Sequence, residues 1–201
     1  MSTFTLRIRA FLVLFYSYHN DVVVTLPDAS THHVASSEPW EYSHNFDFIH
    51  TRVTMGCWSN FQTQIAEQAF RYLNPGGYFE SHEIDHVLRC DDGTLREDSQ
   101  LLAWISDLVV ASEACDRPIA WAGEMKRIYQ EVGFVDVQQR AIKLPMNAWP
   151  KDDRLKELGR MWNSNFASGL GGFSVLLFNR VYGRTPSEIE VSFAYFQSIF
   201  M

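Results

Sequence analysis

The sequence predicts an α/β fold built around parallel strands. Two short apolar segments, Phe46–His50 and Tyr78–Glu83, have the length and composition of buried strands. Between them, Phe61–Leu73 places apolar residues every three or four positions, as an amphipathic helix does. A strand, a helix and a second strand in this order predict a crossover between two parallel strands. We therefore expect a parallel sheet with helices packed on it.

A further strand is expected near the start of the chain. Val22–Thr25 is a β-branched run and predicts a buried strand of the parallel type. Residues 27–45 are rich in serine, histidine and proline and predict an irregular connection. The apolar run Ala10–Phe15 is too short to cross a membrane and predicts a buried strand or helix. Because a sheet with an open edge is unstable, we expect Val22–Thr25 or Arg9–Tyr18 to complete it.

Two helices and a strand are predicted after Glu83. Apolar residues at helical spacing predict helices over Leu101–Val109 and Trp121–Val132. Gly133 ends the second helix, since glycine readily takes the left-handed conformation that closes a helix. Val135–Leu144 then predicts a strand.

The C-terminal part of the chain predicts helices. A helical pattern begins at Lys151, and Gly169–Gly172 predicts a turn between two helices, because no strand leads into it. Thr185–Glu188 has the pattern of a capping box and predicts a last helix that runs to about Phe200. We expect one domain, with a core over residues 1–150 and a helical lid over residues 151–201.

Composition excludes several classes of protein. With 46% hydrophobic and 20% charged residues, the 201-residue chain has the balance of a globular protein. Its formal net charge of -7 is the wrong sign for a nucleic-acid partner. The 3 cysteines form no Cys-x-x-Cys pair, so neither a disulfide framework nor a thiolate zinc site is predicted. We expect no membrane anchor, and a reducing compartment such as the cytoplasm or nucleus.

Candidate functional residues lie where the two central strands end. Ligands bind at the carboxyl ends of strands in open parallel sheets. Here these ends are rich in titratable groups, as a site for proton transfer or a polar ligand requires, although strand ends also collect polar residues simply because they are solvated. The residues are His50, Arg52, Glu80, His82, Glu83, Asp85 and His86.

Other chemistries have weaker support in the sequence. Glu80, His82 and His86 share a parity, but no regular element sets a metal-binding spacing, so no metal site is predicted. No Gly-x-Ser-x-Gly elbow of a serine hydrolase is present. Cys57 could act as a nucleophile with His50, but a small buried thiol is the commoner role for such a cysteine.

An ordered series of segments resembles the class I S-adenosylmethionine-dependent methyltransferases, and more closely the LaeA-like methyltransferases of fungi. The resemblance spans about residues 38 to 195. The segments that carry it are Glu38–Trp40, Asn45–Arg52, Leu73–Glu80, Asp91–Leu95, Gly133–Val137 and Trp149–Gly159.

This resemblance implies a Rossmann-like sheet with a helical lid, and methyl transfer from S-adenosylmethionine in fungal secondary metabolism or its regulation. It places His50 and Arg52 beside the cofactor. It places Glu80 and His82 nearer the methyl acceptor, as catalytic residues. The implied partner is a small-molecule acceptor or a protein.

The first part of the chain departs from the family pattern. Its first glycine is Gly56, so the family's glycine-rich cofactor loop has no counterpart. The acidic residue expected at the end of the second strand is not found at Thr25 or Leu26. We therefore expect a partial, truncated Rossmann-like core. It is either a methyltransferase whose cofactor is held by other residues or a partner subunit, or a catalytically inactive remnant acting as a protein-interaction module.

Overall fold

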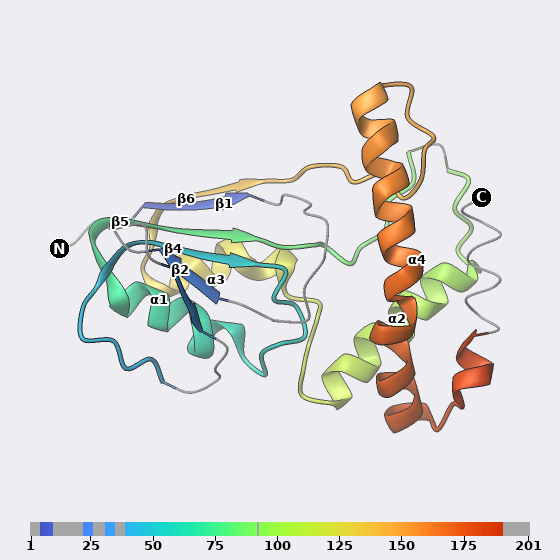
Figure 1. Cartoon of the computed structure of the whole chain (residues 1–201), viewed down its shortest axis with the longest axis horizontal. Coiled ribbons are helices and arrows are strands. Elements are labelled where there is room, and N and C mark those ends of the chain that lie inside the picture. The colour runs from blue at the N-terminus through green and yellow to red at the C-terminus, as the bar shows by residue number, and fades with distance from the viewer. Residues whose placement is uncertain (1–4, 10–21, 26–30, 35–38, 92, 191–201) are drawn as a thin grey trace. The chain divides into compact units, whose positions relative to one another are not determined.

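The computed structural model describes residues 5–9, 22–25, 31–34, 39–91 and 93–190 (Figure 1). The chain divides into two compact units. The first unit comprises the described residues up to Asp85 together with Arg117–Ile142. The second comprises the described residues of His86–Asp116 and those from Lys143 onward. The predicted division into a core and a lid at residue 150 stays a prediction.

The first unit is built on a six-stranded sheet with the strand order β3-β2-β4-β5-β1-β6. Strands β4, β5, β1 and β6 are parallel to one another, whereas β2 is antiparallel to both β3 and β4. The neighbouring strands β4 and β5 are drawn side by side in Figure 1. The bounds of the strands are β1 Thr5–Arg9, β2 Val22–Thr25, β3 Thr31–Val34, β4 Phe46–Arg52, β5 Leu73–His82 and β6 Val135–Arg140.

The parallel pairing of β4 with β5 confirms the predicted central unit, and Val22–Thr25 is a strand of the sheet as expected. Two finer predictions are wrong. Thr31–Val34 is a strand inside the predicted irregular connection, and Val22–Thr25 is antiparallel rather than parallel. The short link over residues 26–30 explains the antiparallel pairing of β2 with β3, since parallel neighbours need a connection of roughly a dozen residues or more.

The N-terminal strand β1 was not predicted. It lies between β5 and β6 and is parallel to both. Most of the candidate segment Arg9–Tyr18, including Ala10–Phe15, lies outside the described residues.

The helices of the first unit confirm the two helices predicted over Phe61–Leu73 and Trp121–Val132. A π-helical turn over Gln62–Ala66 continues into α1, Glu67–Tyr72, and a 3-10 turn over Ala122–Glu124 continues into α3, Met125–Val132. Gly133 ends α3 with φ +115°, and its amide donates to the Tyr129 carbonyl. These helices pack on the sheet through a shared apolar core that includes Ile49, Ile65, Ala69, Phe79, Met125, Ile128, Tyr129 and Phe134.

Strand β5 begins five residues earlier than predicted, at Leu73. Phe46 pairs with Leu73 but Phe48 pairs with Tyr78, so extra residues bulge out of β5 between them. Gly77 lies in this bulge, where an added Cβ would meet the Asn74 and Asp47 carbonyl oxygens at 3.0 and 3.1 Å. The residues between Leu73 and Tyr78 thus form a bulge, and α1 passes directly into the strand.

The second unit contains α2, Gln100–Ala114, and the 30-residue helix α4, Asp153–Tyr182. Both confirm predicted helices, but the predicted turn at Gly169–Gly172 is wrong because these residues lie inside α4. Each interior glycine costs a helix about 1 kcal/mol. Packing against α2 offsets this cost: Leu170 is buried, and the Trp104 indole donates to the Ser174 hydroxyl over 2.9 Å.

The capping box after α4 is confirmed. The Thr185 amide donates to a Glu188 carboxylate oxygen over 2.8 Å, and the Glu188 amide donates to the Thr185 hydroxyl over 3.4 Å. Residues 186–190 are helical, and the rest of the predicted last helix lies outside the described residues. Within the described part of the chain, no helix has both the length and the apolar character needed to cross a membrane.

Candidate functional site

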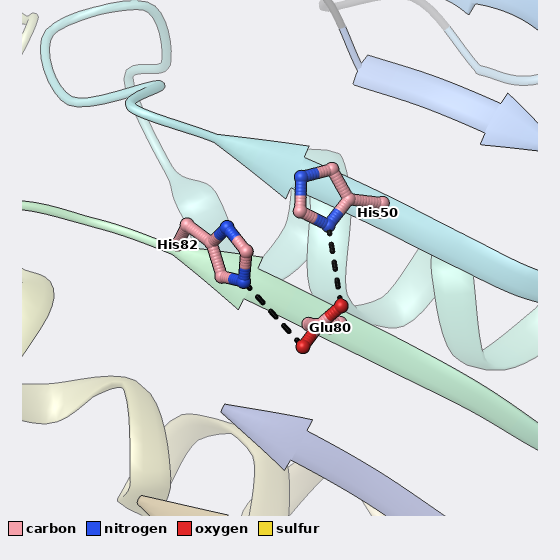
Figure 2. Close-up of side chains that lie close together, drawn as sticks. All are labelled: His50, Glu80 and His82. Atoms are coloured by element: carbon pink, nitrogen blue, oxygen red, sulfur yellow. Dashed lines mark ion pairs between the residues drawn. The ribbon is translucent and has the colours of Figure 1, made fainter. Parts of the chain in front are cut away.

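Three of the predicted site residues meet on one face of the β4 and β5 pair. His50 on β4 stands beside Glu80 on β5 in the parallel register, and His82 follows two residues after Glu80. Residues two apart on a strand point to the same face of the sheet. The register and this alternation therefore bring together side chains that are 30 residues apart in the sequence, as Figure 2 shows.

Glu80 lies between the two histidines. Its Oε2 atom is 3.7 Å from His50 Nδ1, and its Oε1 atom is 3.4 Å from His82 Nε2 (Figure 2). The two imidazole rings meet edge to face, with their centroids 4.6 Å apart. The three side chains are 16–20% exposed, so they are largely desolvated, and both ring nitrogens of His82 are buried. We call His50, Glu80 and His82 the histidine–glutamate cluster.

The protonation state of His50 follows from its surroundings. Burial, together with the nearby His82 and Arg52, lowers the pKa of His50 to about 4, although Glu80 opposes the shift. Burial dominates because it penalises the charged imidazolium. At neutral pH His50 is therefore a neutral imidazole, which can accept a proton or donate a lone pair.

The opposite face of the same strands carries a buried hydrogen-bonded chain. The Thr51 and Ser81 hydroxyls lie 2.7 Å apart, and the Ser81 hydroxyl lies 2.7 Å from that of Tyr129. Burial raises the pKa of Tyr129 well above its usual value, so this phenol stays protonated. The chain joins β4, β5 and α3 directly behind the histidine–glutamate cluster.

Glu83 was predicted with the other strand-end residues, but it points away from them. It is buried, and its Oε1 atom accepts hydrogen bonds of 2.8 Å from both the amide and the hydroxyl of Thr54. Burial raises the pKa of Glu83 to about 7, against the effect of the Thr54 hydrogen bonds. In addition, the Val53 amide donates to the His82 carbonyl over 2.7 Å. These contacts fix the segment that follows β4 against the end of β5.

The different orientation of Glu83 could have been predicted from the sequence. Strand alternation places Ser81 and Glu83 on the face opposite Glu80 and His82. The partner Thr54, in contrast, could not be identified from spacing.

The remaining candidates lie outside the histidine–glutamate cluster. Arg52 pairs with His82 in the register but has an exposed side chain. Asp85 is exposed, and His86 belongs to the second unit. Burial raises the pKa of Cys57 to about 12, which keeps its thiol protonated and favours the role of a small packed thiol over that of a nucleophile.

The described residues do not fit the usual way in which class I methyltransferases hold S-adenosylmethionine. That mode of binding requires a strand followed by a glycine-rich loop and a helix, with the loop at the carboxyl edge of the sheet. The strand beside β4 is instead β2, which runs antiparallel, so its carboxyl end lies at the opposite edge. The sequence before Gly56 also contains no glycine.

Comparison with known proteins finds fungal methyltransferases. The chain is 37% identical over 152 residues to Methyltransferase pytC of Aspergillus terreus. The aligned residues cover 76% of this chain and 47% of that protein. It is 35% identical over 146 residues to Secondary metabolism regulator LAE1 of Cochliobolus heterostrophus, covering 72% and 47%. It is 33% identical over 135 residues to Protein-methionine methyltransferase laeA of Chaetomium globosum, covering 66% and 42%.

The chain thus spans about half the length of the curated relatives it matches. No protein-family model matches it. No solved structure matches it either.

Proposed function

Because the chain belongs to the LaeA-like methyltransferases of fungi, we propose that it takes part in methyl transfer in fungal secondary metabolism or its regulation. The observation that carries this proposal is the meeting of His50, Glu80 and His82 on the two strands through which the sequence resembles that family. Relatives named as methyltransferases and as regulators of secondary metabolism support the biological setting.

The histidine–glutamate cluster would act on the methyl acceptor. Methylation of a hydroxyl, a thiol or an amine that carries hydrogen releases a proton, and a positioned imidazole or carboxylate can accept it. Glu80 and His82 provide these two groups within 3.4 Å of one another. His50 and Arg52 remain the candidates for contact with S-adenosylmethionine, the methyl donor that the resemblance implies.

A second function is favoured by the antiparallel β2. A chain that offers no glycine-rich loop beside β4 leaves the polar groups of S-adenosylmethionine without their usual backbone donors. In this case the protein is a catalytically inactive relative that binds another protein. Neither function specifies the methyl acceptor or the binding partners of the whole protein.

Calorimetric titration of the full chain with S-adenosylhomocysteine distinguishes the two functions. Saturable binding that is weakened by His50→Gln or Arg52→Gln, but not by the exposed control Arg127→Gln, supports methyl transfer. A wild-type chain that releases no heat up to millimolar ligand contradicts it. Recovery of a specific protein partner from the native fungus then supports the second function.

A further inference from the structure

We propose that His50, Glu80 and His82 bind a divalent transition-metal ion of the Zn²⁺ class. This proposal concerns metal binding alone and does not require the chain to transfer a methyl group. Within the described residues, these three offer one ligand atom each, and all three atoms lie within 4.8 Å of one another.

The donor atoms suit zinc better than magnesium or calcium. Magnesium and calcium prefer sets of oxygen ligands, whereas two imidazole nitrogens and one carboxylate form a common zinc set that leaves the fourth position open. Zinc bonds of about 2.0–2.2 Å place neighbouring donors of a tetrahedron roughly 3.3–3.6 Å apart. The Glu80 contacts of 3.4 and 3.7 Å are made by its two different carboxylate oxygens, and the set with one atom from each residue lies within 4.8 Å, so side-chain rotations are needed to reach this range.

The two imidazoles need only a small movement to complete the site. Their rings meet edge to face at 4.6 Å between centroids. The nitrogen atoms that they offer lie within 4.8 Å, so ring rotations that bring them about 1 Å closer reach the tetrahedral separation. Such rotations leave the backbone in place.

The backbone under the site is rigid. All three residues stand on neighbouring parallel strands, so no loop has to become ordered when the ion binds. Behind them, the hydrogen-bonded chain of Thr51, Ser81 and Tyr129 fixes the two strands to each other and to α3. The entropic cost of assembling the ligands is therefore small.

The charge balance also favours a cation, with one opposing group. Glu80 supplies a negative charge, but the ring nitrogens of His82 are buried, so a side-chain rotation has to open the way for an ion. Arg52 is close enough for its positive charge to act on His50. Because this guanidinium repels a cation, removing its charge should tighten metal binding.

The test is a calorimetric titration of the full chain with zinc chloride, followed by Co²⁺ substitution and visible absorption. The background variant Cys90→Ser removes an exposed thiol that could bind zinc on its own. We expect one saturable site with micromolar affinity or better, and intense Co²⁺ bands of four- or five-fold coordination. His50→Gln, Glu80→Gln and His82→Gln should each weaken binding by about tenfold or more, and Arg52→Gln should strengthen it several-fold.

The control is His44→Gln, which changes an exposed histidine outside the histidine–glutamate cluster and should leave the affinity unchanged. Circular dichroism melting shows whether each variant is folded, so that a lost site is not confused with a lost fold. Equal zinc affinity in the wild type and in a folded His50→Gln/His82→Gln double variant would overturn the proposal. Failure to bind S-adenosylhomocysteine leaves this result unaffected, so the two proposals fail separately.

Discussion

The two faces of the β4 and β5 pair use the same strands for different purposes. On the face toward α1 and α3, Phe79 is fully buried and Ser81 joins hydrogen bonds of 2.7 Å. On the other face, Glu80 and His82 are partly exposed and lie at a looser 3.4 Å. Tight contacts between buried groups are typical of structural support, whereas a looser cluster of titratable side chains is typical of a binding site. We therefore propose that the alternation of this strand places structural support on one face and a binding site on the other.

The largest effect is expected from Phe79→Ala on the buried face. Removing this ring leaves a cavity in the core and should lower the free energy of unfolding by about 3–5 kcal/mol. The neighbouring Tyr78 is 41% exposed and points to the other face, so Tyr78→Ala should cost about 1 kcal/mol or less. Urea denaturation measures both. Equal losses from the two substitutions would show that the faces do not differ in this way.

The second effect is a pH dependence caused by Glu83. Its pKa of about 7 in the folded chain lies above the ordinary 4.5 of an unfolded glutamate, so the folded state binds the proton more tightly. This contribution to stability is fully present below about pH 4.5 and is lost as the pH rises to about 7. The shift corresponds to about 3 kcal/mol.

The Glu83→Gln variant tests this dependence, because a glutamine cannot ionise. The free energy of unfolding should fall less between pH 4.5 and pH 7.5 in this variant than in the wild type. The exposed Glu97→Gln serves as the matched control and should keep the wild-type slope. A wild-type slope in Glu83→Gln would contradict the assignment.

A smaller effect is expected from Tyr129→Phe. The substitution removes one hydrogen bond to Ser81, which keeps its contact with Thr51, and should cost about 1 kcal/mol of unfolding free energy. Zinc affinity should stay within about twofold, because Tyr129 lies behind the strands. Thermal denaturation and the zinc titration together measure this. A loss of zinc binding in a folded variant would mean that the two faces are coupled.

The smallest effect on stability is expected on the open face itself. His50→Gln and His82→Gln should change the unfolding free energy by about 0.5 kcal/mol or less, because both side chains are partly exposed and make loose contacts. Urea denaturation in a metal-free buffer checks this. A loss comparable to that of Phe79→Ala would assign the histidines a structural role instead.

Local patterns in the sequence predicted the central elements of the fold. The apolar stripe of Phe61–Leu73 and the apolar runs on either side correctly indicated α1 and the parallel pair β4 and β5. Thr5–Arg9 alternates apolar and charged residues, as a half-buried strand does. Strand β1 escaped prediction because the segment is only five residues long and gains its place by pairing with residues about 70 and 130 positions away. The helix through Gly169–Gly172 depends on packing against α2, which no local pattern contains.

The candidate site was predicted as a set of residues but not as an arrangement. His50, Glu80 and His82 were all identified from their positions near strand ends. Their convergence depends on the register of β4 against β5, which periodicity alone does not fix. For the same reason the sequence did not predict the proposed metal site, since His50 comes from the strand next to the one that carries Glu80 and His82.

The most direct test of the account is to follow the histidine side-chain nitrogens by NMR while one equivalent of Zn²⁺ is added to the folded chain. If the open face of β4 and β5 is a binding site, the resonances of His50 and His82 shift together, and those of His44 and His86 stay in place. Unchanged resonances of His50 and His82, or equal shifts of all four histidines, would contradict it.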